Sequence, residues 1–192
     1  MKPGDIRYKD QNDDGVIDEK DRVILGNPFP RYTFSFNYAA QFKGFDVSVF
    51  FQGVGKRSAW IRGEATEAFH NNNEGPVMDF HLDRWTPSNP SATYPRLTVG
   101  SESVNNAAKS DFWIEDAAYL RLKNLQVGYT LPNSVTQKIG VSQFRFFFTS
   151  QNLLTFTKLR SGYDPEVFNG QSQSGRVYPV AKVNALGVNL NF

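Results

Sequence analysis

The last twelve residues, from Ala181 to Phe192, constrain the fold more than any other stretch of the chain. Apolar side chains occupy every second position of this segment, with small or polar residues between them, at Leu186, Val188, Leu190 and Phe192. Such alternation is typical of a β-strand with one dry face and one wet face. The strand also finishes on an aromatic residue. A transmembrane β-barrel explains this pattern, because its last strand closes the barrel and leaves no edge.

The composition of the chain excludes several classes of function. The formal net charge is only +2, with both signs mixed, so we expect no nucleic-acid partner. The absence of cysteine excludes disulfides, thiolate nucleophiles and thiolate metal sites. Aromatic residues make up 15% of the chain, yet no apolar run approaches the roughly 18 residues of a membrane-spanning helix. A barrel reconciles these two facts, because only every second residue of its strands faces lipid.

The start of the chain carries no export signal. Met1-Lys2 is followed at once by Pro3-Gly4, without the apolar region of a signal peptide. We therefore expect a signal to lie upstream and this chain to be the carboxy-terminal piece of a larger protein.

Residues 32–54 are predicted to form a β-hairpin. The segment from Tyr32 to Phe42 alternates without a slip, Lys43-Gly44 forms the turn, and residues 45–52 continue the alternation. Each arm is about 10 residues long, whereas soluble strands average roughly 5 to 6 and membrane-crossing strands need about 9 to 11. The length of the arms therefore favours a membrane protein.

Residues 118–155 are predicted to form two strands joined by a short turn. The apolar positions of the first strand change parity near Lys123-Asn124. One extra residue flips the register of a strand, so a β-bulge at this point would return all the apolar residues to one face. The residues concerned are Leu120 and Leu122 before the switch and Leu125, Val127, Tyr129 and Leu131 after it.

Long irregular segments over 55–117 and 156–180 separate these strands. They are rich in Gly, Asn, Ser and Pro, with short helices expected over 65–69 and 77–85. A loop of about 60 residues argues against a compact soluble domain but is expected on the outer side of a barrel. The tryptophans in or beside the first of these loops are expected to pin it together rather than to bind a ligand. They are Trp60, Trp85 and Trp113.

The five predicted strands, ending with residues 181–192, are joined by short and long connections in alternation. All short turns therefore fall on one side of the membrane and all long loops on the other. A periplasmic carboxy terminus makes the turn within 118–155 periplasmic and the loops 1–31, 55–117 and 156–180 extracellular. The predicted fold class is all-β, an antiparallel transmembrane β-barrel segment with long extracellular loops.

Residues 10–21, within the first loop, match the calcium loop of an EF-hand. Oxygen ligands stand at loop positions 1, 3, 5, 9 and 12, and Gly15 stands at position 6, where the chain turns sharply. Carboxylates this close repel one another unless a cation lies between them. The predicted ligands of a structural Ca²⁺ are Asp10, Asn12, Asp14, the carbonyl of Val16, Asp18 and Asp21. Position 12 departs from the template, because Asp21 is shorter than the usual Glu. The alternative interpretation is a solvated acidic turn.

A series of short motifs runs in order along the whole chain at the spacing of one protein family. The motifs are Pro3–Asp10, Ile24–Pro28, Lys43–Asp46, Phe50–Val54, Pro95–Leu97, Tyr119–Asn124, Gly128–Pro132, Ser150–Leu153, Phe156–Lys158 and Gly162–Glu166. On these motifs the chain resembles the carboxy-terminal segment of SusC/RagA-type TonB-linked outer-membrane transporters of the Bacteroidetes.

The resemblance implies a barrel of about 22 strands filled by an amino-terminal plug. It implies TonB-driven import of glycans or peptides through the outer membrane, with a SusD-like lipoprotein on the outer face and no enzymatic activity. The barrel wall would contact outer-membrane lipid. The barrel-assembly machinery would recognise Phe192 as the terminal aromatic residue. Five strands cannot close such a barrel by themselves.

Other functions have weaker support in the sequence. His70 and His81 are interpreted as ordinary surface or loop histidines, since they lie too far apart for a helical metal pair. Asp164 and Glu166 flank a proline, and an acid–base pair there lacks a partner scaffold.

The alternative to the transporter is a soluble, calcium-stabilised β-sandwich that binds carbohydrate. The two folds differ in the surroundings of the apolar side chains of the hairpin, which face lipid in a barrel and a second sheet in a sandwich. These side chains are Phe34, Phe36, Val47 and Val49.

Overall fold

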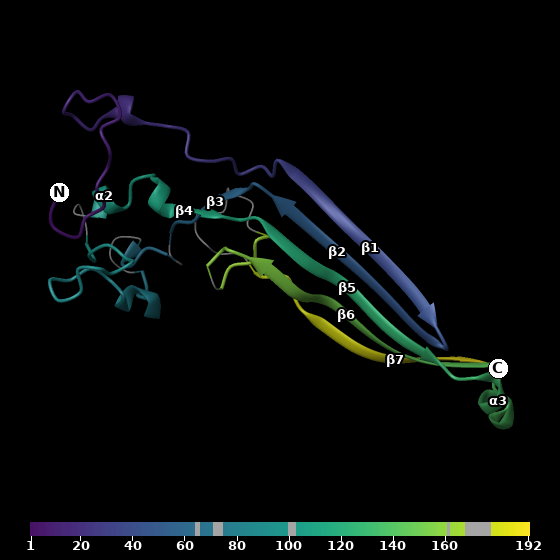
Figure 1. Ribbon diagram of the computed structural model, residues 1–192. Coiled ribbons are helices and arrows are strands. Elements are labelled where there is room, and N and C mark those ends of the chain that lie inside the picture. The colour runs from purple at the N-terminus through teal and green to yellow at the C-terminus, as the bar shows by residue number, and fades with distance from the viewer. Residues whose placement is uncertain (64–65, 71–74, 100–102, 161, 168–177) are drawn as a thin grey trace. The chain divides into compact units, whose positions relative to one another are not determined.

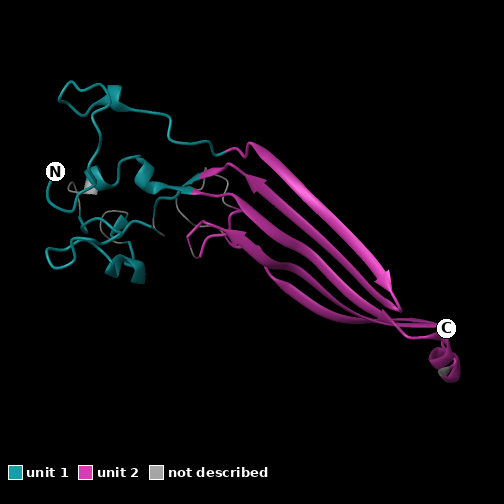
Figure 2. Ribbon diagram, in the orientation of Figure 1, with its two compact units in different colours: residues 1–28, 59–115, 169–177 teal, residues 29–58, 116–168, 178–192 magenta. Residues whose placement is uncertain are grey.

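A computed structural model describes residues 1–192 except 64–65, 71–74, 100–102, 161 and 168–177. The chain divides into two compact units (Figure 2). The first unit comprises residues 1–28, 59–115 and 169–177, and the second comprises residues 29–58, 116–168 and 178–192.

The second unit is built on one five-stranded antiparallel sheet. Its strands lie side by side in the order β1-β2-β5-β6-β7 (Figure 1). The all-β fold class and the five antiparallel strands expected from the sequence are confirmed. The strands are β1 (Tyr32–Phe42), β2 (Phe45–Gly55), β5 (Tyr119–Thr130), β6 (Gln143–Thr157) and β7 (Val183–Asn191). Each of them has at least 9 residues, which is the length of a membrane-crossing strand.

The turn between β1 and β2 explains the register of the hairpin. Lys43 and Gly44 both have positive φ angles, of 48° and 86°. Two positive φ angles are the signature of the type I′ turn, whose twist matches that of the flanking strands. Phe42 and Phe45 are therefore paired directly, and the pairing continues without a break to Tyr32 and Gly55.

The β-bulge expected near Lys123-Asn124 is confirmed. Asn124 pairs with Phe50 of β2, but Leu122 pairs with the next residue, Phe51, so Lys123 is the extra residue. The ladder between β5 and β6 shifts at the same point. As a result, Leu122 and Leu125 lie on one face of the sheet although their sequence parity differs.

The short connection from β5 to β6 holds two turns of helix that the sequence did not predict. They are α3 (Asn133–Thr136) and the 3₁₀ turn η5 (Gln137–Ile139). The segment ends at Gly140 in the left-handed conformation (φ 71°), and the Val141 N–H donates to the Thr136 carbonyl at 3.1 Å. This arrangement is a common helix C-cap.

The remaining elements are short. A second sheet pairs β3 (Ser58–Trp60) with β4 (Ile114–Asp116). The helical turns are η1 (Glu19–Asp21), η2 (Asp79–Leu82), α2 (Ser103–Asn106) and η4 (Asp111–Trp113). Of the two helices expected from the sequence, the one over 77–85 is the single turn η2, and the one over 65–69 extends outside the described residues. Within the described part of the chain, no helix has both the length and the apolar character needed to cross a membrane.

The exposure of the first hairpin excludes the soluble sandwich. Phe34 and Phe36 are 46% and 57% exposed, whereas a sandwich requires them in a core. In the described residues the only other sheet is β3–β4, with strands of three residues each. Such a sheet is too small to cover five long strands.

We expect the substitution Gly53→Ala to destabilise the sheet by about 1–3 kcal/mol. A Cβ atom at Gly53 would lie 2.4 Å from Cζ of Phe34 and 2.8 Å from the backbone oxygen of Tyr119, which is held in the ladder. Urea unfolding of the purified full-length protein, followed by circular dichroism, measures the effect. Ser48→Ala, at an exposed position of the same strand, is the control. Equal effects of the two substitutions would contradict the tight packing of the aromatic ring on this glycine.

Candidate functional site

The Asp10 carboxylate organises the loop over residues 10–21. Its Oδ1 accepts the Asp13 N–H and its Oδ2 accepts the Gly15 N–H, both at 2.7 Å. Asp13 and Gly15 both have positive φ angles, of 61° and 82°. The chain therefore turns tightly around one carboxylate, as the spacing of the sequence predicts.

Asp21 closes the same loop. Its carboxylate accepts the N–H groups of Asp18 and Gln11, each at 2.7 Å. These hydrogen bonds hold the pKa of Asp21 below its usual value, and the one from the Asp18 N–H has the largest effect. The Asn12 side-chain oxygen accepts a hydrogen bond from the Asp14 N–H at 3.1 Å. The Asp14 carboxylate in turn accepts one from the Val16 N–H at 3.0 Å.

Among the described residues, no three Asp, Glu, His or Cys side chains are placed to share a metal ion. The Lys20 ammonium group lies 3.5 Å from Asp14 Oδ2 and 3.8 Å from Asp18 Oδ2. The donor set nevertheless consists of the hard oxygens that Ca²⁺ prefers. Calcium binding at this loop therefore stays a prediction.

The segment that leads into this loop is anchored by Asp5. Its carboxylate accepts hydrogen bonds from Arg96 Nε at 2.5 Å and from Asn106 Nδ2 at 3.1 Å. Burial acts to raise the pKa of Asp5, but these hydrogen bonds outweigh it and the pKa is lowered. Gly4 packs under the Trp85 ring, so closely that a Cβ atom would lie 2.4 Å from Cε3. Two motifs far apart in the sequence thus meet at one ion pair.

The two histidines have structural roles. His81 is fully buried, and its Nδ1 accepts the Met78 N–H at 2.8 Å. The proton is therefore on Nε2, which donates to the Thr66 carbonyl at 2.9 Å. His81 was expected on the surface or in a loop, but it is buried in the helical turn η2. His70 Nδ1 lies 2.9 Å from Glu67 Oε2.

Trp113 pins its loop together, as expected. It is 2% exposed, and its Nε1 donates to the Asn106 carbonyl at 2.8 Å. Its ring meets that of Tyr94 edge to face, with centroids 5.8 Å apart. Trp60 makes a different kind of contact. The Lys109 ammonium lies 4.4 Å from the centroid of the Trp60 ring, which is a cation–π contact.

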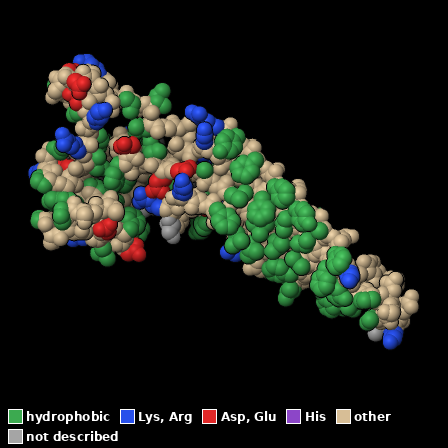
Figure 3. All heavy atoms as spheres, in the orientation of Figure 1, with side chains coloured by type: hydrophobic (Ala, Val, Ile, Leu, Met, Phe, Trp, Pro, Cys, Tyr) green, Lys and Arg blue, Asp and Glu red, His purple; other side chains and the backbone are tan. Residues whose placement is uncertain are grey.

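One face of the five-stranded sheet, here called the apolar face, carries a layer of exposed apolar side chains (Figure 3). Its exposed members are Tyr32, Phe34, Phe36, Tyr38, Phe42, Phe45, Val127, Phe146, Leu154, Phe156, Leu186, Val188 and Leu190. A strand of 11 residues spans about 33 Å, or about 25 Å when tilted by about 40°. That height equals the lipid-facing band of a transmembrane barrel.

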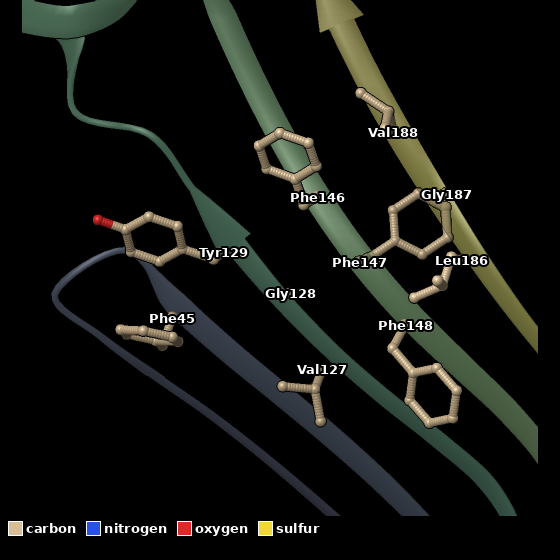
Figure 4. Close-up of a pocket in the computed structure, with 10 residues that line it drawn as sticks. All are labelled: Phe45, Val127, Gly128, Tyr129, Phe146, Phe147, Phe148, Leu186, Gly187 and Val188. Atoms are coloured by element: carbon tan, nitrogen blue, oxygen red, sulfur yellow. The ribbon is translucent and has the colours of Figure 1, made fainter.

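The apolar face contains a shallow groove of about 490 Å³ (Figure 4). Phe45 and Tyr129 form one wall, with ring centroids 4.5 Å apart. The other lining residues are Val127, Gly128, Phe146, Phe147, Phe148, Leu186, Gly187 and Val188. Apart from the Tyr129 hydroxyl, the lining side chains offer no polar group to orient a ligand. A solute-binding site would need such groups, so the groove belongs to the apolar face.

The opposite face of the sheet, the polar face, carries an ion-pair cluster that the sequence analysis missed. Arg121 Nη2 donates to Asp164 Oδ1 at 2.6 Å, and Nη1 donates to Glu166 Oε2 at 2.5 Å. Its Nε donates to Thr155 Oγ1 at 2.9 Å on the adjacent strand. Lys123 Nζ binds both oxygens of Glu166, at 2.9 and 3.0 Å. We call these four charged residues the Arg121 cluster.

The Arg121 cluster fixes the loop after β6 to the polar face. The Asp164 carboxylate also accepts the N–H groups of Glu166 and Val180, each at 2.9 Å. Asp164 and Glu166 therefore pair with cations rather than act as an acid–base pair. The signal available in the sequence was the placement of Arg121 and Lys123 at the polar positions of a strand.

The pKa of Asp164 follows from these contacts. Burial acts to raise it, but the Arg121 hydrogen bond and the two backbone N–H groups outweigh burial, and the pKa is lowered. The carboxylate is therefore charged throughout the physiological range.

A second ion pair lies at the opposite end of the polar face. Arg145 donates to both oxygens of Asp46, from Nε at 2.9 Å and from Nη2 at 2.5 Å. The pair crosses over Gly128, where a Cβ atom would lie 2.4 Å from Arg145 Nη2. The polar face thus carries charges at both ends.

Comparison with known proteins gives consistent matches along the whole chain, although no protein-family model matches it. The chain is 32% identical over 200 residues to TonB-dependent receptor P26 of Formosa agariphila, covering 98% of this chain and 20% of the receptor. It is 28% identical over 192 residues to TonB-dependent receptor SusC of Bacteroides thetaiotaomicron, covering 100% of this chain and 18% of that protein. The chain therefore spans about a fifth of the length of these relatives.

Among solved structures, the chain is similar to the RagAB peptide importer in its open-open state. The identity is 27% and the TM-score is 0.63. The match covers 88% of this chain and 18% of the solved chain.

We expect Asp164→Asn to lower the stability of the full-length protein by about 2 kcal/mol at pH 7, because charged hydrogen bonds are lost. Since the folded pKa is lowered, this contribution is fully present above the unfolded value of about 3.9 and is lost as the pH falls through the folded value. Thermal unfolding of both proteins between pH 8 and pH 3 should show a constant difference above about pH 5 that closes at the acid end. A difference that grows towards low pH would contradict this assignment.

Proposed function

Because the chain belongs to the SusC/RagA family of TonB-dependent receptors, we propose that its five strands form part of the wall of a nutrient-importing barrel in the outer membrane. One observation carries this proposal. The apolar face holds large side chains that are about half exposed, whereas the polar face holds ion pairs. A barrel wall with lipid on one side and an aqueous lumen on the other satisfies both faces.

The connections between the strands support an orientation in the membrane. β1 starts opposite the end of β2, and the long connections leave the sheet at this same end. The short turns at 43–44 and 131–142 lie at the other end. Outer-membrane barrels place their short turns in the periplasm and their long loops outside. In this orientation the loop over residues 10–21 is extracellular.

The partners follow from the same family membership. We propose that the whole receptor works with a SusD-like lipoprotein on its outer face and draws energy from TonB. Phe192, which is 91% exposed, would be the aromatic residue that barrel-assembly machinery recognises. The RagAB structure is described as a peptide importer. A charged polar face suits transport of peptides or oligosaccharides, both of which are polar oligomers.

Tryptophan quenching in lipid vesicles tests the orientation of the two faces. Phe36→Trp places a reporter on the apolar face, and Asn37→Trp places one on the polar face of the same strand. In full-length receptor reconstituted into phosphatidylcholine with brominated acyl chains, we expect strong additional quenching for Phe36→Trp and little for Asn37→Trp. The unsubstituted receptor supplies the background from its other tryptophans. Equal quenching at both positions would overturn the proposal.

We further propose that residues 10–21 bind a structural Ca²⁺ through Asp10, Asn12, Asp14, Val16, Asp18 and Asp21. The spacing of hard oxygen ligands and the tight turn around Asp10 support this proposal. On binding, the ion would replace Lys20 beside Asp14 and Asp18, and the ligand oxygens would turn towards it.

Hydrogen exchange of residues 8–22 measures calcium binding at this loop. We expect added Ca²⁺ to slow exchange there and a chelator to reverse the change. The double substitution Asp10→Ala with Asp14→Ala should abolish the response. Asp13→Asn is the matched control, since Asp13 lies in the same loop but is not a predicted ligand, and it should respond like the parent. An exchange pattern unaffected by Ca²⁺ in the parent would show that the loop is a solvated acidic turn.

A further inference from the structure

The two carboxylates of the Arg121 cluster are held in different ways. Asp164 accepts two backbone N–H groups in addition to Arg121, and its side chain is 7% exposed. It is therefore part of the loop framework. Glu166 is held by the side chains of Arg121 and Lys123, and it is 26% exposed. Glu166 is thus the carboxylate that can leave without unfolding the loop.

The cations that hold Glu166 require an anion in its place. The side chain of Arg121 is 3% exposed and that of Lys123 is 21% exposed. The Lys123 ammonium group donates to both oxygens of the Glu166 carboxylate. Leaving a buried or half-buried cation without a counter-charge costs several kcal/mol. If Glu166 swings away, the position between Nη1 of Arg121 and Nζ of Lys123 is a preformed site for another carboxylate.

The remaining donors of the cluster keep this site in place when Glu166 leaves. Arg121 retains Asp164 and Thr155 as partners, at 2.6 and 2.9 Å. The loop retains its backbone contacts to Asp164 and the hydrogen bond from Arg57 Nη1 to the Pro165 carbonyl at 2.8 Å. Glu166 can therefore exchange while the frame around it persists.

We propose that Lys123 and Arg121 form a carboxylate-binding site on the polar face, in which Glu166 is an internal ligand that an incoming solute carboxylate displaces. The site would take the terminal carboxylate of a peptide or the carboxylate of an acidic oligosaccharide. This proposal rests on the proposed function, because the solute reaches the polar face through the lumen of the barrel.

Paired probes that differ by one carboxylate test this site. Tetraglycine and its carboxy-terminal amide form the peptide pair, and digalacturonate and digalactose form the sugar pair. Binding to detergent-solubilised full-length receptor is measured by calorimetry. If Glu166 fills the site about 90% of the time, Glu166→Gln raises the affinity for the carboxylate probe about tenfold and leaves the neutral probe unchanged.

Two further variants separate this role from a purely structural one. Adding Lys123→Gln to Glu166→Gln should remove the preference for the carboxylate probe. Asp164→Asn should lower the melting temperature but keep the ratio of the two affinities within about twofold of the parent. Glu166→Asp keeps the charge on a shorter side chain, so it should raise the affinity for the carboxylate probe less than Glu166→Gln does. It replaces Glu166→Gln in the test if Glu166→Gln fails to fold.

The outcomes distinguish this proposal from the one on which it rests. An unchanged ratio of carboxylate to neutral affinity, in Glu166→Gln or in Glu166→Asp, overturns the carboxylate site. A response to one probe pair alone identifies the solute class. The same variants, carrying Phe36→Trp and reconstituted into the brominated phosphatidylcholine, report on lipid contact. Strong quenching without a carboxylate preference overturns this inference only, whereas absent quenching removes the barrel orientation as well.

Discussion

The contrast between the two faces of one sheet is the constraint on which this structure depends. Period-two alternation places aromatic and aliphatic side chains on the apolar face and the ion pairs on the other, over strands of 9 to 15 residues. In water, such an apolar face needs a second layer to cover it. Phe36 and Leu186 are 57% and 86% exposed, and in the proposed barrel wall lipid would supply the missing cover. In that wall the strand length and the exposure would have the same cause, since the hydrocarbon layer of the membrane would set both.

The bulge at Lys123 makes this contrast compatible with the charges of β5. Arg121 and Lys123 point to the polar face, and without the bulge Leu125 and Val127 would follow them there. The extra residue flips the register, so that Leu122 and Leu125 both reach the apolar face. The same insertion therefore keeps apolar side chains on one face and the charged side chains of the ion pairs on the other.

Local patterns in the sequence were sufficient to predict the strands, the hairpin turn at Lys43-Gly44 and the bulge, because parity and turn chemistry are properties of neighbouring residues. The contacts of the candidate sites are not local. Arg121 meets Asp164 across 43 positions, and Arg96 meets Asp5 across 91. Such pairs depend on the path of long loops, which alternation does not determine. For that reason the sequence drew attention to Asp164 and Glu166 but gave them no partner, and it did not connect Arg121 with them.

The carboxylates of this chain are held in two ways, and the difference bears on where a cation is needed. Asp5 and Asp164 each face an arginine and are almost fully buried. The loop over residues 10–21 instead holds six carboxylates and one lysine. Its carboxylates accept backbone N–H groups, which orient them but bring no counter-charge. Hydrogen bonds from neutral donors leave the mutual repulsion of these groups in place. A divalent cation therefore has the most to contribute at this loop and little to add at the two arginine anchors.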